Sequence, residues 1–263
     1  MSAIADFQAL LPDSLDWPET LLMMLAASSG ASITTVAGAG GGLLVLIALA
    51  QWLPPAALVP VHGMVQLGAN LGRLGMTWDS VRWPVVLAFL PGALLGAWLA
   101  SRILITLPDA LWLGLIGGFV LILAWLPHVP GAVVGLPGVV IFAALSTFLS
   151  LFVGATGPLV AAFIRQMGEK RFATVATFAA CMSIQHAPKA IAFGALGFVM
   201  RDWLGLIVLL MACTVVGNFI GVRLLKKLAN KRFQLLLKVV LSLLAARLLW
   251  QAGVEILESS ATA

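Results

Sequence analysis

The chain has 263 residues, of which 62% are hydrophobic and only 10% are charged. Soluble globular domains carry about 25% charged residues, so this composition excludes a soluble protein and predicts an all-α polytopic transmembrane protein. The formal net charge of +5 at pH 7 comes from basic connections between hydrophobic segments and indicates no nucleic-acid surface.

Ten hydrophobic segments follow an acidic amino-terminal tail, residues 1–19, which lacks the basic region of a cleaved signal peptide. A helix needs about 20 apolar residues to cross a bilayer, so the second and seventh segments are too short to span one alone. The nine tryptophans lie near segment ends, as in an aromatic belt. The segments cover residues 20–37, 41–53, 56–76, 84–101, 110–126, 138–154, 158–167, 172–200, 203–224 and 233–250, and a tail is expected at 251–263.

A break in the helical pattern precedes each short segment. The first break, Thr34–Gly42, holds four glycines, and a glycine inside a helix costs about 1 kcal/mol relative to alanine. The second break, Val153–Leu159, has the same place in the second half. Unwound backbone inside a membrane must line a polar cavity or pack against other protein, so a close helix-packing seam is the alternative to a binding site. Because a half-helix begins with free N–H groups, we expect these residues to bind an anion: Gly40, Gly41, Gly42, Thr156 and Gly157.

The breaks belong to an internal repeat of about five segments, which divides the chain into residues 20–126 and 138–250. Such repeats are common in secondary transporters. Basic residues near 168–171 and 223–232 mark these connections as cytoplasmic and put both termini outside. An odd number of segments in each half makes the repeat inverted. A count of eight spans, with each broken pair as one crossing, would make it parallel; we prefer the inverted arrangement because it brings both glycine tips towards the midplane.

Two basic residues, Arg73 and Lys189, lie inside the hydrophobic segments at matching positions of the repeat. All ten acidic residues fall in a tail or a connection, so no carboxylate within a segment can pair with them. A charge inside the membrane normally faces a partner in the bundle, and the missing negative charge is then the substrate. The alternative for both residues is snorkelling to an interface.

Polar residues accompany each of these two cations. On the third segment, one helical face holds His62, Gln66, Asn70 and Arg73. On the eighth segment, the group comprises Gln185, His186 and Lys189. We expect both groups to contribute to an anion site, although the two histidines are equally explained as interior residues with satisfied hydrogen bonds.

The glycine-rich first break, the run Val61–Arg73 and the repeated Gly-x-x-Gly break resemble the TauE/SafE family, also called the sulfite exporter or 4-toluenesulfonate uptake permease family. The resemblance covers nearly the whole chain and rests on glycines and a few polar residues. It implies secondary transport of sulfur-containing organic or inorganic anions across the bacterial cytoplasmic membrane. The second break departs from the pattern at Thr156 and Pro158, so the two half-sites need not be equivalent.

We therefore predict a secondary transporter that moves a sulfonate, sulfite or related organosulfur anion by alternating access. Its partners are the small anion and membrane lipid, with a homo-oligomer left open, and no metal or other cofactor is expected. An anion channel and a transporter of non-sulfur carboxylates are the alternatives. An intramembrane enzyme is disfavoured because the chain has no His-Glu-x-x-His motif and no acidic pair. Cys181 and Cys213 lie in apolar segments, which indicates packing rather than a disulfide or a metal site.

Overall fold

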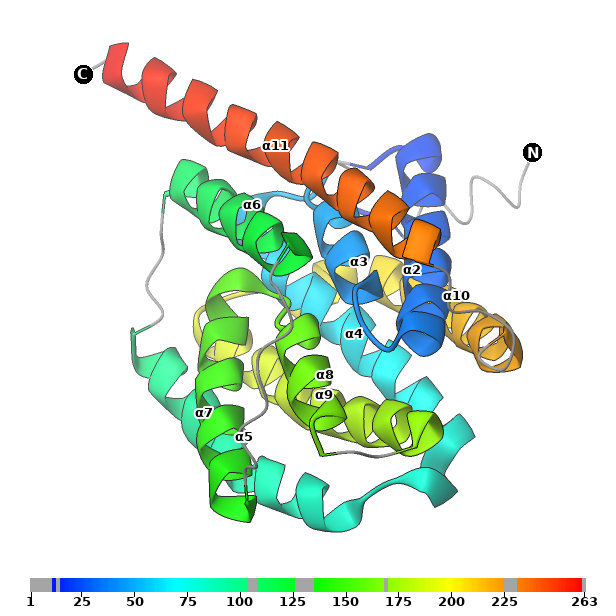
Figure 1. The fold of residues 1–263 in the computed structure, drawn as a ribbon. Coiled ribbons are helices and arrows are strands. Elements are labelled where there is room, and N and C mark those ends of the chain that lie inside the picture. The colour runs from blue at the N-terminus through cyan, green and yellow to red at the C-terminus, as the bar shows by residue number, and fades with distance from the viewer. Residues whose placement is uncertain are drawn as a thin grey trace.

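The computed structural model describes residues 11–12, 15–103, 108–125, 135–167, 170–224 and 231–261, in which every regular element is helical (Figure 1). Much of the acidic tail and of the basic connection after residue 224 lies outside the described residues. The first half contributes α2 (Trp17–Ala37), α3 (Gly41–Leu49), α4 (Pro55–Thr77), α5 (Trp83–Ile103) and α6 (Asp109–Trp125). The second half contributes α7 (Leu136–Val153), α8 (Gly157–Arg165), α9 (Arg171–Ala195), α10 (Leu204–Leu224) and α11 (Lys231–Ala261). Short 3₁₀ turns precede α5 and α10: η1 (Trp78–Ser80) and η2 (Met200–Trp203).

Each expected hydrophobic segment corresponds to one of these helices, which confirms the all-α polytopic fold. The clearest difference is at the carboxyl end. Helix α11 continues to Ala261, through most of the segment 251–263 that we expected to be a tail. No proline interrupts this segment, and apolar Ile256 and Leu257 continue the helical sequence.

The two breaks are short and sharp. Gly38 and Gly40 have φ values of 79° and 99°, and Gly154 has a φ of 81°, a region that favours glycine. Helix α3 folds back along α2, so a Cβ atom at Gly41 would lie only 1.7 Å from the carbonyl oxygen of Gly30. The glycines of the first break therefore serve close helix packing as well as the unwound turn.

The two halves share one pattern of helices. The first helix of each half ends at residue 37 or 153, the short helix begins at 41 or 157, and the next helix begins at 55 or 171, a separation of 116 residues each time. Each half packs a helix against the other half: α5 of the first half lies along α7, and α10 of the second half lies along α2. These contacts are close because Gly92, Gly96, Gly217 and Gly221 leave no side chain between the backbones.

Equivalent helices of the two halves run in opposite directions. On α6 and α11, the indole nitrogen of Trp125 donates a hydrogen bond to Ser242 at 2.8 Å, whereas Gly114, near the start of α6, lies against Ala252. Helices related by an axis along the membrane normal would instead be parallel. The packing thus has the form of an inverted repeat rather than of the parallel alternative.

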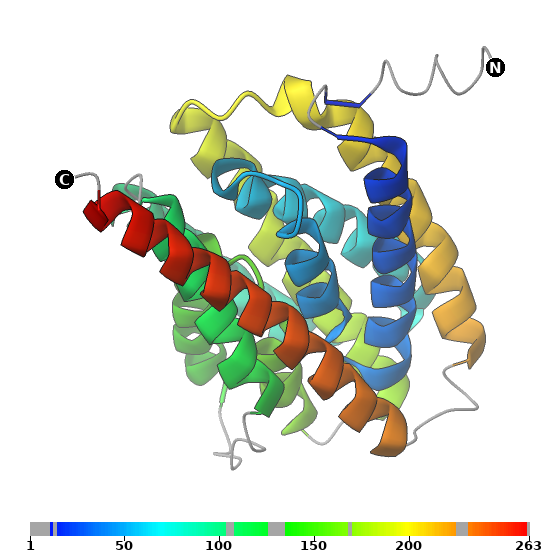
Figure 2. The same cartoon turned by 90° about the horizontal axis from the view of Figure 1, so that it is seen from above.

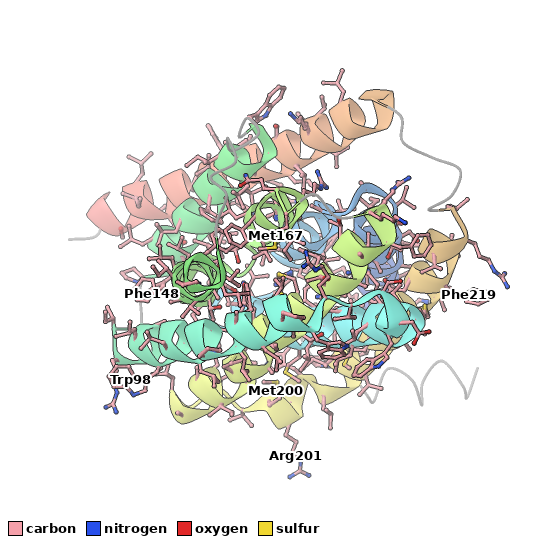
Figure 3. All side chains as sticks on the ribbon, turned by 60° about the horizontal axis from the view of Figure 1, so that its bottom comes forward. Trp98, Phe148, Met167, Met200, Arg201 and Phe219 are labelled. Atoms are coloured by element: carbon pink, nitrogen blue, oxygen red, sulfur yellow. The ribbon has the colours of Figure 1, made fainter. Side chains whose placement is uncertain are left out.

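The outer surface is apolar, and a cluster of polar residues with two cations lies buried within an otherwise apolar interior. Trp98 and Phe219, at the rim of the bundle in Figure 3, are 53% and 48% exposed, whereas Arg73 and Lys189 are 1% and 0% exposed. Within the described residues, five helices are long and apolar enough to cross a membrane: α2, α5, α7, η2 with α10, and α11 from Lys238. Helices α4 and α9 carry the polar residues and cross the middle of the bundle (Figures 1 and 2).

Candidate functional site

A small cavity lies where the two breaks meet α4 and α9. About 20 Å³ is open to the centre of a water molecule, and a cavity needs about 10–15 Å³ of such space to hold one water. The cavity therefore has room for about one water molecule, and a larger anion needs the walls to move apart. Seven of the residues predicted from the sequence line this cavity: Gly40, Gly42, His62, Gln66, Asn70, Gly157 and His186.

The first break is held against α4. Nε2 of His62 donates to the carbonyl oxygen of Gly42 at 3.0 Å, because a carbonyl can only accept. A Cβ atom at Gly42 would point at the side-chain amide of Gln66, 3.4 Å from its oxygen. Asn70 donates to the backbone oxygen of Gln66 at 2.7 Å, which fixes its own amide beside the cavity. Gly41 instead faces α2, so its neighbour Gly42 is the glycine that faces the cavity.

The second break is held by residues that do not line the cavity themselves. Lys189 donates from Nζ to the carbonyl oxygen of Gly154 at 2.6 Å, and its side chain passes Gly63 of α4. Gln185 donates to the hydroxyl of Thr156 at 2.5 Å. The predicted residues Thr156, Gln185 and Lys189 thus form a layer behind the cavity wall, where they position the second half-helix tip.

Arg73 lies apart from the cavity, in a network of neutral acceptors. Its guanidinium donates to the hydroxyl of Thr35 at 2.8 Å and to the amide oxygens of Asn70 at 2.9 Å and Asn218 at 3.1 Å. Asn218 in turn donates to the backbone oxygen of Ala69 at 2.6 Å. Arg73 therefore ties α2, α4 and α10 together, and its contact with the cavity is indirect, through Asn70.

Neither buried cation reaches the surface of the protein by snorkelling. Every hydrogen bond that Arg73 and Lys189 make to the described residues goes to a neutral oxygen. Their environments nevertheless differ, although they occupy matching positions in the repeat. Arg73 has three side-chain acceptors, whereas Lys189 has one backbone acceptor and lies against Gly63, next to His62.

The two histidines face one another across the cavity. The ring centroids of His62 and His186 are 6.0 Å apart and the rings are close to perpendicular, at 78°. Among the described residues, neither Nδ1 atom has a hydrogen-bond partner, although both are buried. Unpaired buried polar atoms are uncommon in native interiors, so this pair calls for a functional explanation.

Sequence reasoning missed the apolar wall of the cavity, which Phe178 and Met182 provide from α9. The internal repeat contains the signal that would have found them. Adding 116 to the number of each cavity residue on α4 gives its equivalent on α9. His62 thus corresponds to Phe178, Gln66 to Met182 and Asn70 to His186. Asn218, the partner of Arg73, carries no such signal because α5 and α10 begin 121 residues apart, so the separation of 116 residues does not hold there.

An apolar exterior, buried cations that bond to neutral oxygens within the described residues, and a central cavity between two broken helices define a multi-pass membrane transport protein. A family model described as sulfite exporter TauE/SafE matches residues 14–248, and the chain belongs to this family. The family consists of membrane transporters of sulfite and related anions rather than of enzymes. With the apolar helices, it assigns the chain to the cytoplasmic membrane of a bacterium. No curated protein and no solved structure matches the chain.

Proposed function

We propose that this protein is a secondary transporter of small organic sulfonates, which it carries through the central cavity by alternating access. The observation that carries this proposal is the two-sided cavity. On α4 the wall is polar throughout, with His62, Gln66 and Asn70, whereas α9 presents Phe178 and Met182 beside a single imidazole. A molecule with a charged head and an apolar substituent matches both walls.

The polar wall and the first half-helix tip suit the sulfonate group. The first internal hydrogen bond of α3 is donated by Leu44 to Gly40, so the preceding N–H groups have no partner within the helix. These groups lie at the positive end of the helix dipole, which favours an anion. The amides of Gln66 and Asn70 supply further donors for sulfonate oxygens.

The proposal is tested by the melting temperature of the purified protein with 4-toluenesulfonate, methanesulfonate, sulfite, 4-methylbenzoate and acetate. A ligand that binds only the folded state stabilises it by about 2.7 kcal/mol at 100 times its Kd. We expect the two sulfonates to raise the melting temperature more than sulfite and more than either carboxylate. Equal or larger shifts with the carboxylates would support the carboxylate alternative, and no shift with any of the five anions would contradict the proposal.

The apolar wall gives a specificity prediction. Met182→Gln copies onto α9 the residue that the repeat has at Gln66 of α4, and it replaces a thioether with an amide. A contact of about one methylene is worth roughly 10- to 200-fold in discrimination, so we expect the preference for 4-toluenesulfonate over sulfite to fall by about 10-fold. The measurement is competition between the two anions for uptake into vesicles. Met76→Gln, at an exposed position of α4, is the matched control and should keep the parent preference.

Alternating access requires contacts that close one side and can separate. On the side that the basic residues mark as cytoplasmic, Arg165 at the end of α8 donates to the carbonyl oxygen of Ala37 at 2.7 Å, and Arg171 of α9 donates to that of Val36. These bonds join the second half to the carboxyl end of α2, where the helix dipole attracts cations. The first half has apolar residues at the equivalent positions, Leu49 and Pro55.

We therefore expect the double variant Arg165→Gln and Arg171→Gln to favour the inward-open state. Exposed charge-assisted contacts contribute roughly 0.2–1 kcal/mol each, so the open population should rise roughly 2- to 30-fold. The population of the open state is measured with Thr34→Cys in a background with Cys181→Ala and Cys213→Ala. A larger open population should make this cysteine react faster with an alkylating reagent added from the cytoplasmic side. Arg102→Gln, at the other end of the bundle, should label like the parent. Unchanged labelling of the double variant would show that the two arginines do not hold the cavity closed.

A further inference from the structure

We infer that the protein couples anion transport to a proton, which His62 binds at Nδ1. This inference rests on the proposed function, because the anion and the proton share the central cavity. In the hydrogen bond to Gly42, Nε2 of His62 must donate, so Nε2 carries the proton of the neutral ring. Nδ1 is then a base with a free lone pair, buried and without a partner among the described residues.

The charged groups around His62 make proton binding depend on the anion. The side chain of Lys189 on α9 lies against Gly63, the neighbour of His62 on α4, so its positive charge opposes a second one in the cavity. An anion between these groups removes that opposition and favours the protonated imidazole. Binding of the two ligands is then mutually favourable, since coupling between sites is reciprocal.

Two other titratable groups lie at the cavity, His186 in its lining and Lys189 behind its wall. The proton is assigned to His62 because the hydrogen bond to Gly42 fixes its tautomer and leaves Nδ1 as the base. Helices α3 and α7 contain no titratable side chain. Arg73 lies farther along α4, in its network of neutral oxygens. The remaining titratable residues on the neighbouring helices lie at helix ends or on apolar faces: Glu19, Asp109, Arg165, Arg171, Cys181, Cys213 and Arg223.

Each transport cycle then moves a proton with the anion. On one side, Nδ1 of His62 takes a proton from water as the sulfonate binds, and the imidazolium and the sulfonate together are electrically neutral. After the halves rearrange, the sulfonate leaves, Lys189 again opposes the imidazolium, and Nδ1 returns the proton to water on the other side. One proton and one monovalent anion cross together, so each cycle moves no net charge across the membrane.

The test uses proteoliposomes with a pH-sensitive dye inside and radiolabelled methanesulfonate outside, at a membrane potential clamped to zero with potassium and valinomycin. Methanesulfonate is a strong-acid anion and carries no proton itself. For the parent protein we expect methanesulfonate and protons to enter in equal numbers, so the lumen acidifies. His62→Gln keeps an N–H donor for the oxygen of Gly42 but has no base, so its methanesulfonate uptake should no longer acidify the lumen. His128→Gln makes the same change at the remaining histidine of the sequence, which lies outside the described residues, and it should behave as the parent.

A second measurement does not depend on any variant. Addition of methanesulfonate to the detergent-purified parent protein in weakly buffered solution should raise the pH, because binding takes up protons. Methanesulfonate uptake without acidification, or acidification retained in His62→Gln, would overturn the inference. Loss of acidification in His186→Gln but not in His62→Gln would overturn the assignment to His62. Absence of methanesulfonate and 4-toluenesulfonate uptake by the parent would instead contradict the proposed function, and the coupling with it.

Discussion

Gly42→Leu is expected to abolish sulfonate transport and to leave folding and membrane insertion intact. A Cβ atom at Gly42 would lie 3.4 Å from the side-chain oxygen of Gln66, an ordinary contact distance, so the backbone accepts a side chain there. The rest of the leucine side chain would occupy the cavity, which has only about 20 Å³ for a water-sized group. Uptake by the folded variant should therefore fall to the level of empty vesicles.

Two further glycine variants control this experiment. At Gly75, no atom lies within 4 Å of an added Cβ, so Gly75→Leu should transport as the parent does. At Gly41, an added Cβ would lie 1.7 Å from the carbonyl oxygen of Gly30, so Gly41→Leu should prevent the α2–α3 hairpin and be lost as misfolded protein. Size-exclusion profile and melting temperature establish folding, and radiolabelled uptake measures transport. A folded Gly42→Leu protein with normal uptake would show that the first break does not line the transport pathway.

Lys189→Met is expected to lower sulfonate affinity by about 10- to 100-fold without destabilising the empty protein. Lys189 is completely buried, and its hydrogen bond goes to a backbone carbonyl rather than to a carboxylate. Because Lys189 lies behind the cavity wall, it acts on the anion through its charge, and loss of an attraction of about 1.4–2.7 kcal/mol corresponds to this loss in affinity. Removal of a buried ammonium that lacks a carboxylate partner can offset the lost bond to Gly154, so the melting temperature of the empty protein should stay level or rise.

The lysine prediction is read from ligand-induced shifts in melting temperature with 4-toluenesulfonate. Lys189→Arg keeps the charge but changes its shape, and Gly63 leaves little room beside the side chain, so its affinity should be intermediate. Lys238→Met removes a cation that lies over the ring of Trp125 at the periphery and should leave affinity unchanged. If Lys189→Met binds as tightly as the parent, the buried ammonium does not attract the substrate.

The fold follows closely from sequence because membrane constraints act locally. Hydrophobic length defines α2, α5, α7 and α10, and glycine or proline clusters end the helices at the breaks. Gly92 and Gly96 also mark a seam at which α5 approaches α7. These properties depend on neighbouring residues along the chain, so the helices were predicted to within a few residues, except for the length of α11.

The site was predicted less completely because it depends on how helices face one another. The sequence does not distinguish Gly41 from Gly42, because the direction in which α3 folds back on α2 decides which one faces the cavity. It also does not show that Arg73 meets Asn218, which comes from α10 far along the chain. The apolar wall, by contrast, could have been predicted from the sequence, since Phe178 is the equivalent of His62 in the internal repeat.

The most direct test of sulfonate transport by alternating access is counterflow. Proteoliposomes are loaded with unlabelled 4-toluenesulfonate, diluted into a trace of the radiolabelled compound, and followed over time at clamped membrane potential. A carrier whose cavity opens to one side at a time exchanges outgoing for incoming substrate, so the label should accumulate transiently above its external concentration. Acetate inside the vesicles should not drive this accumulation. Label that only equilibrates, at a rate that does not saturate with concentration, would indicate a channel and would contradict the account.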